Sequence, residues 1–349
     1  MQSRFASPLI LFLLLSVAPW LTAGANEEVL RILAWPGYAD NDLVQTFEER
    51  YGVKVEVSLV SSDDVMREKL GRNQGSDYDV FAANTAEMQH YIERGLVQPL
   101  DLGNIPNTVR QLKRFRDLQA IPGATQDNRI YAIPFTYSEM GLIYDRQQFT
   151  SPPTSLASLW DPQFQGRVLA FDTSGHNFSI ASLMLGGAPF QISDGDFTKV
   201  SEKLVALRRN VLTFYTLPEE VVALFREHPI ALVYANYGRQ QLKQLQDAGA
   251  DVGYVIPREG ALAWLDCWAV SRGAQNPKMA ENWINYSLEP SVSKVFSQRQ
   301  GLANTLELSA ATASSDTIIW LEPVEDAARR AALWARIMSG YRPSTLNRP

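Results

Sequence analysis

One segment of the sequence places an acid among aromatic rings in a pattern that could bind a cation. Residues 260–268 read GALAWLDCW, so Asp266 stands between Trp264 and Trp268 in an apolar stretch. A buried carboxylate needs a partner, because burying an unpaired charge is costly. A ligand ammonium would accept that role, with Trp264 adding a cation–π contact of about 0.5–2 kcal/mol. The residues alone leave a second interpretation open, in which Asp266 caps a turn and the tryptophans are core.

The sequence offers little for catalysis. It has no glycine-rich phosphate loop and no HExxH, GxSxG or CxxC motif. Of its three histidines, His90 and His228 stand beside charged residues, as surface side chains do. Cys267 is the only cysteine, and its place next to Trp268 favours a small buried thiol over a nucleophile. We therefore expect no enzyme activity, no cofactor and no bound metal.

The beginning of the chain predicts export. Arg4 precedes an almost unbroken apolar run, Pro8 to Leu21, which ends in the small residues TAGA at 22–25. This is the pattern of a cleavable signal peptide, and the run is shorter than the ~20 residues that span a membrane. We expect residues 1–25 to be removed at Ala25/Asn26 and the mature protein to be periplasmic. No cysteine follows the run, so no lipid anchor is expected.

Composition limits the partners. Removing Arg4 takes 32 basic residues to 31 against 38 acidic ones, a net charge of −7. Acidic excess with interspersed signs argues against nucleic acid or anionic membranes as partners. One cysteine allows no intramolecular disulfide, so stability must come from packing. The remaining chain of about 320 residues exceeds what one core usually organises, which predicts two lobes.

The elements that must position Asp266 begin with a strand–helix alternation. Asp40 is expected to cap the first helix and Gly52 to end it. The expected strands are Leu30–Ala34, Val53–Leu59 and Tyr78–Ala82, and the expected helices are Asp40–Tyr51, Ser62–Arg72 and Ala86–Glu93. Such alternation predicts an α/β lobe with a mostly parallel sheet. Ligands bind at the carboxyl ends of such strands, so Trp35–Tyr38 and Asn84–Thr85 are expected to face a cleft.

A second lobe is expected after the apolar, aromatic segment Phe135–Tyr144. Its expected strands and helices are Val168–Asp172, Phe178–Leu185, Asp196–Arg208, Glu219–Glu227, Ile230–Tyr234 and Val252–Ile256. Cys267–Val270 is expected to be a strand that returns to the first lobe, followed by helices over Pro277–Leu288, Ser291–Gln300 and Val324–Met338. The predicted first lobe is 26–136 with 265–305, and the second is 137–264 with 306–349. Crossing segments between two lobes make a hinge, with the ligand cleft between them.

Several motifs in one order resemble the periplasmic spermidine/putrescine-binding proteins of bacterial polyamine importers, a group of the bacterial extracellular solute-binding proteins (family 1). They are AWPGY at 34–38, YDV at 78–80, IPFTY at 133–137, SLWD at 158–161 with FQG at 164–166, and WLD at 264–266. The likeness runs through nearly the whole mature chain. It implies a bilobal α/β fold of type II periplasmic-binding proteins, no catalysis, and partnership with an ABC permease and its ATPase in the inner membrane. We expect a monomer.

The resemblance also assigns ligand-binding residues. Trp35 and Tyr38 correspond to the family's aromatic turn, in which Gly37 replaces an acid that some members carry. Trp264 and Asp266 match the family's aromatic–acid pair directly. The full set of expected ligand-binding residues is Trp35, Tyr38, Asn84, Thr85, Tyr137, Thr173, His176, Tyr234, Arg239, Trp264 and Asp266.

The second lobe departs from the family pattern. The family places ligand-binding acids where this sequence has Thr173 and His176. A diamine needs a negative partner near each ammonium, because an isolated buried charge costs several kcal/mol. With Asp266 for one amine and donors such as Arg239 at the other end, the cleft would suit an ω-amino acid such as 4-aminobutyrate or 5-aminovalerate. Putrescine or spermidine is the next most favoured ligand.

Three alternatives stay open. Glu139 and Glu219 could restore the diamine hypothesis if they point into the cleft. A ferric-iron receptor could use the phenolates of Tyr234 and Tyr237. An enzyme on the same scaffold could use Cys267 or His176.

Overall fold

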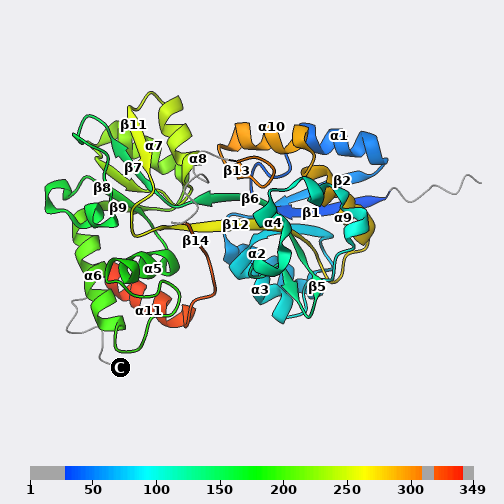
Figure 1. Ribbon diagram of the computed structural model, residues 1–349, viewed down its shortest axis with the longest axis horizontal. Coiled ribbons are helices and arrows are strands. Elements are labelled where there is room, and N and C mark those ends of the chain that lie inside the picture. The colour runs from blue at the N-terminus through cyan, green and yellow to red at the C-terminus, as the bar shows by residue number, and fades with distance from the viewer. Residues whose placement is uncertain (1–27, 309–317, 341–349) are drawn as a thin grey trace, which may run out of the picture.

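The computed structural model describes residues 28–308 and 318–340, so the expected signal peptide lies outside the described residues. The chain folds into two α/β lobes side by side (Figure 1), which confirms the expected fold class. Two long strands, β6 (Ala132–Glu139) and β12 (Ala261–Val270), run between the lobes. In the described part of the chain, no helix has the length and apolarity needed to cross a membrane.

The sheet of the first lobe has the strand order β13-β6-β12-β3-β1-β2, and β14 pairs with β12. Its remaining strands are β1 (Val29–Ala34), β2 (Lys54–Leu59), β3 (Val80–Asn84), β13 (Ala303–Asn304) and β14 (Ile318–Trp320). β1 is parallel to β2 and β3, as the alternation predicts. β12 is antiparallel to both β3 and β6, so the sheet is mixed rather than mostly parallel. The reason is that the chain returns from the second lobe in the opposite direction.

Helices cover both sides of this sheet. Figure 1 shows α1 and α10 on one side and α2 and α3 on the other. The helices are α1 (Asn41–Tyr51), α2 (Asp63–Gly71), α3 (Thr85–Glu93), the short α4 (Lys113–Arg116), α9 (Pro277–Ser287) and α10 (Pro290–Gln300). Short 3-10 turns include η4 (Leu118–Ala120).

Local signals at the helix ends are mostly as expected. Gly52 ends α1 in the left-handed conformation, with φ of 66°. Ser62 caps α2 by accepting a hydrogen bond from the backbone N–H of Val65 at 3.2 Å. Asp40 is the N-cap residue of α1, as expected, but its side chain makes no capping hydrogen bond. Its carboxylate instead accepts a hydrogen bond from Arg299 at 3.1 Å.

The second lobe is built on a five-stranded mixed sheet with the order β11-β7-β10-β8-β9. Its strands are β7 (Leu142–Asp145), β8 (Val168–Phe171), β9 (Val211–Tyr215), β10 (Leu232–Tyr234) and β11 (Val252–Val255). Its helices are α5 (Ser174–Met184), α6 (Phe197–Asn210), α7 (Pro218–Glu227), α8 (Arg239–Asp247) and α11 (Ala327–Met338). The sequence did not predict β9 or α8.

The apolar core divides at the crossing strands. Tyr137 and Leu265 pack in the core of the first lobe, whereas Met140 and Leu262 pack in a core of the second. Trp264 is partly buried and packs against both. This tryptophan therefore lies where the lobes meet.

β12 is longer than the sequence predicts, because the GALAWLDCW segment is itself the crossing strand from Ala261 onward. Its residues are buried on both faces, so the alternation of apolar and polar residues that marks a half-exposed strand is missing. Asp266 stands opposite Asn84 of β3 and Thr136 of β6, and the register with β6 shifts just after it.

Candidate ligand site between the lobes

Asp266 is the centre of the candidate site. Only 6% of this residue is exposed, and its Oδ2 accepts a hydrogen bond of 2.6 Å from the hydroxyl of Tyr38. Tyr38 is held in turn by edge-to-face contacts with Phe135 and Phe296, at ring-centroid distances of 5.6 and 5.2 Å. The carboxylate is therefore fixed by a rigid, buried phenol.

The electrostatic state of Asp266 is unusual for an aspartate. Burial raises its pKa to about 7, the hydrogen bond from Tyr38 opposes this shift, and the nearby carboxylate of Asp63 adds to it. Among the ion pairs of the described residues, none gives Asp266 a lysine, arginine or histidine partner. A cation brought by a ligand would therefore stabilise the ionised form.

This pKa predicts a pH-dependent affinity for amines. Only ionised Asp266 attracts an ammonium, and about 90% of a group with a pKa of 7 is ionised at pH 8 but about 10% at pH 6. We expect the dissociation constant of a bound amine to rise about tenfold from pH 8 to pH 6. Calorimetric titrations in buffers of constant ionic strength would measure it, and an affinity that is flat across this range would contradict the assignment.

Asp63 is a second acid at this site and is not among the residues expected from the sequence. Asn84 accepts a hydrogen bond from the backbone N–H of Glu87 at 3.0 Å and so caps α3. The same side chain donates through Nδ2 to Oδ1 of Asp63 at 3.3 Å. Because Asn84 stands opposite Asp266 in the sheet, it connects the start of α2 to the central acid. An acid in a first helical turn is common for helix-dipole reasons, so its sequence position gave no signal.

Tyr237 brings the second lobe to these acids. Burial, then the charges of Glu219, Asp63 and Glu220, raise the pKa of Tyr237 to about 12. Tyr237 follows β10 in the second lobe, whereas Asp63 begins α2 in the first. The phenol therefore lies near carboxylates of both lobes, and Glu219 belongs to this acidic surrounding.

Trp264 and His176 meet through Asn236, which the sequence analysis also missed. The indole Nε1 of Trp264 donates to the backbone oxygen of Asn236 at 3.3 Å, and the side-chain oxygen of Asn236 lies 2.7 Å from Nδ1 of His176. Burial lowers the pKa of His176 to about 4, so the ring is neutral near pH 7. Nδ1 then carries the hydrogen, which leaves Nε2 as an acceptor. Thr173 is half-buried just before α5 and makes no capping bond.

The aromatic turn after β1 is tightly built. The backbone N–H of Tyr38 donates to the backbone oxygen of Trp35 at 3.1 Å, and Gly37 has a φ of 86°. A Cβ on Gly37 would lie 2.1 Å from Nε2 of Gln300, so an acid at this position would have to displace Gln300. Trp35 is half-buried, and its indole Nε1 is buried without an acceptor among the described residues.

Comparison with known proteins assigns the chain to a family. Residues 42–321 match the family model described as bacterial extracellular solute-binding protein. The chain belongs to that family. These proteins bind solutes and are not enzymes, so this chain is a solute-binding protein.

Relatives of this solute-binding protein are named for polyamines. The spermidine/putrescine-binding periplasmic protein 1 of Haemophilus influenzae is 27% identical over 76% of this chain and 72% of its own. The putrescine/agmatine-binding protein of Pseudomonas aeruginosa is 24% identical over 91% and 94%. The structure of a putative spermidine/putrescine ABC transporter from Listeria monocytogenes covers 90% of this chain and 100% of its own, with a TM-score of 0.74 and 21% identity. The last likeness concerns the fold alone.

Three residues expected in the ligand site have other surroundings in this solute-binding protein. Tyr137 stands opposite Leu265, so it lies on the other face of β12 from Asp266, where its hydroxyl accepts a hydrogen bond from Arg114 at 2.9 Å. Tyr234 is 1% exposed, and its hydroxyl donates to the sulfur of Met140. Thr85 is buried and donates to the backbone oxygen of Leu321 at 3.2 Å.

Arg239 and Glu139 are paired with each other. The Nε of Arg239 lies 3.0 Å from Oε1 of Glu139, which is 1% exposed at the end of β6. The guanidinium also lies 5.1 Å from the ring centroid of Tyr254. From the sequence alone, Arg239 is expected to bind a ligand carboxylate, and Glu139 is a candidate partner for a ligand amine. This ion pair satisfies both charges within the protein.

The residues on which the enzyme and iron-receptor hypotheses depend are poorly suited to those functions. Cys267 is fully buried, and burial keeps the pKa of its thiol well above the usual value. Burial likewise raises the pKa of Tyr234 and of Tyr237, which disfavours phenolate ligands to iron. Over residues 28–308 and 318–340, histidine, cysteine and acidic side chains form no cluster of three that could hold a metal.

Proposed function

We propose that this chain is the receptor of an ABC importer and captures a polyamine-type dication such as putrescine between its lobes. The observation that carries the proposal is Asp266, a buried carboxylate beside Trp264 with no cationic partner among the described residues. A ligand ammonium would supply the missing charge and a cation–π contact. The names of the relatives support the same ligand class.

The structure favours a diamine over an ω-amino acid. A ligand carboxylate would need a free cation in the cleft, but Arg239 is paired with Glu139 and His176 is neutral near pH 7. The second ammonium of a diamine would instead interact with the carboxylates of Asp63 and Glu219, whose charges contribute to the raised pKa of Tyr237. The ω-amino acid therefore becomes the competing outcome of the test below.

Capture would work by closing the hinge. Asp266 and Asp63 belong to the first lobe, whereas Asn236, His176 and Tyr237 belong to the second. A dication that is held by the residues of the first lobe and touches those of the second would bind the closed arrangement more tightly than the open one. Its binding would therefore favour closure. The permease and its ATPase would then receive the ligand from the closed receptor. We also propose a periplasmic, monomeric mature protein that begins near Asn26.

Calorimetry with putrescine and 5-aminovalerate tests the ligand class, and Asp63→Asn tests the second acid. We expect putrescine to bind more tightly than 5-aminovalerate, which shares one ammonium but ends in a carboxylate. Asp63→Asn is expected to weaken putrescine about tenfold, the value of one hydrogen bond to a charged group. Glu68→Gln is the matched control, because Glu68 is an exposed acid of the same helix paired with Arg72. Tighter binding of 5-aminovalerate would overturn the diamine assignment.

A further inference from the structure

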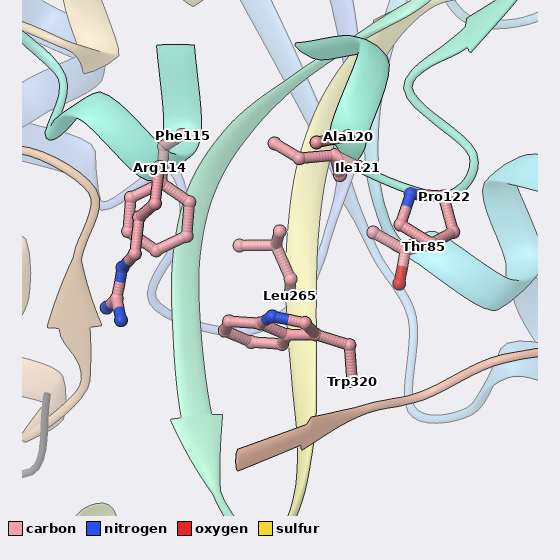
Figure 2. A pocket seen from close by; sticks show the side chains of 8 residues that line it. All are labelled: Thr85, Arg114, Phe115, Ala120, Ile121, Pro122, Leu265 and Trp320. Atoms are coloured by element: carbon pink, nitrogen blue, oxygen red, sulfur yellow. The ribbon is translucent and has the colours of Figure 1, made fainter. Parts of the chain in front are cut away.

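A cavity of about 70 Å³ lies on the face of β12 opposite Asp266. Leu265 points into it, because side chains alternate along a strand and Leu265 is next to Asp266. Figure 2 shows Leu265 and Trp320 at its centre, with Ile121 above them, Arg114 and Phe115 on one side and Thr85 on the other. One water needs roughly 10–15 Å³, so the space suits a small organic molecule rather than a single water.

One polar group of the lining lacks a partner. Arg114 donates through Nη2 to the hydroxyl of Tyr137 at 2.9 Å, and its guanidinium packs on the rings of Phe115 and Tyr137 at 4.6 and 5.2 Å from their centroids. Its Nε is buried and has no acceptor within the described part of the chain. The ion pairs formed by these residues include none with Arg114. A buried N–H without an acceptor destabilises the protein, and an occupant that accepts this hydrogen bond would remove the cost.

The surrounding charge favours an anion. Among the described residues that line the cavity, none is an acid. Three exposed cations, Arg110, Lys113 and Arg116, stand within four residues of Arg114, against one exposed acid, Asp117. Cations gathered in this way raise the local concentration of anions, although the chain as a whole is acidic, with a formal net charge of −6. The remaining walls, Leu265, Ile121 and Trp320, are apolar or aromatic.

We propose that this cavity binds a small aliphatic carboxylate, with its anionic end on Arg114 and its alkyl end against Leu265 and Trp320. The planar guanidinium matches a carboxylate in shape as well as charge. The site is separate from the amine site, because the crossing strand β12 lies between them. Trp320 belongs to β14, which pairs with β12 at Ala263, so an occupant would contact both the first lobe and the strand joining the lobes.

Propionate is the probe, and thermal unfolding at pH 7.5 and constant ionic strength is the first measurement. We expect 100 mM sodium propionate to raise the melting temperature by about 2 °C with a saturable concentration dependence. Propionamide, the neutral isostere, and sodium chloride are expected to have no such effect. In a ¹H–¹⁵N correlation spectrum of the arginine Nε–H groups, the signal absent from Arg114→Lys is expected to shift with propionate in the wild type.

Two variants and one control complete the test. Arg114→Lys keeps the charge but removes the Nε–H, and Ala120→Leu fills the space without touching the guanidinium; both are expected to weaken propionate at least fivefold. Arg110→Gln removes an exposed neighbouring charge and is expected to keep most of the response. Putrescine binding should persist in all three, which separates failure here from failure of the proposed function. Equal effects of propionate and propionamide, or an unchanged response in both cavity variants, would overturn the proposal.

Discussion

Replacing Asp266 with asparagine is expected to weaken putrescine binding at least a hundredfold and, above pH 7, to stabilise the ligand-free protein. The substitution removes the charge that attracts the ammonium while keeping an oxygen for the hydroxyl of Tyr38. Loss of a buried charge partner predicts at least a hundredfold weaker binding. Asp266 would thus be required for ligand binding and yet destabilise the ligand-free protein.

The sign of the stability effect follows from the pKa. Burial raises the pKa of Asp266 from 3.8 to about 7 in the folded protein. Between these values the folded state holds a proton that the unfolded state has released, so the free energy of unfolding falls as the pH rises through this interval. The loss approaches about 4 kcal/mol above pH 7, at 1.36 kcal/mol per pKa unit. Asparagine has no charge to bury, so the variant avoids this loss of stability.

Urea unfolding of both proteins at pH 4 and pH 8, with calorimetry at pH 8, would measure these effects. Asp79→Asn provides a control with the opposite character, because Asp79 is 1% exposed and accepts hydrogen bonds from the backbone of Arg31 and Gln275. That variant should lose stability and still bind putrescine once folded. If Asp266→Asn were instead less stable at both pH values and bound normally, Asp266 would be structural.

Replacing Arg330 with methionine is expected to cost about 3–5 kcal/mol of the free energy of unfolding. Arg330 is 0% exposed, and its guanidinium donates to both carboxylate oxygens of Glu325 at 2.8 and 2.7 Å. It also donates to the backbone oxygen of Gly175 and the hydroxyl of Ser179, both in α5, at 3.0 Å. Removing one member of a buried pair leaves the other charge uncompensated. Because α5 starts beside Thr173 and carries His176, we also expect weaker putrescine binding.

The neighbouring arginine provides a matched control. Arg329 is in the same helix and pairs with Asp194, whose side chain is 92% exposed. An exposed pair contributes at most about 1 kcal/mol, and the guanidinium also lies 3.8 Å from the ring centroid of Phe197, so Arg329→Met should lose much less stability than Arg330→Met. Chemical denaturation followed by circular dichroism would compare the two variants. Equal losses in both would show that the buried network does not carry the stability of α5.

The sequence predicts the first lobe well because its strands and helices carry local signals. The apolar spacing of α1 and the glycine after it mark that helix, and Ser62 marks the next. The strand over 261–270 was predicted too short, because burial on both faces removes the alternation that reveals a strand. α8 escaped notice because its sequence, RQQLKQLQD, has only two apolar residues.

The candidate site is harder to predict because its partners are distant in sequence. The bond between Tyr38 and Asp266 joins residues 228 positions apart, and the pair of Arg239 and Glu139 joins residues 100 apart. No local sequence pattern shows that Arg239 and Glu139 form an ion pair and so neutralise each other's charge. The face on which Tyr137 lies depends on its register with Leu265, which only the assembled sheet defines.

The position of β12 has a consequence for the order of folding. This strand lies in the middle of the first sheet, between β6 and β3, yet it follows nearly all of the second lobe in the chain. A ribosome releases residues from the amino end, so the lobe that starts first lacks its central strand until about residue 270 has emerged. The five-stranded sheet of the second lobe can pair earlier, because β7 to β11 all precede β12, although α11 joins this lobe later. The sheet of the first lobe stays incomplete until β12 inserts between β6 and β3.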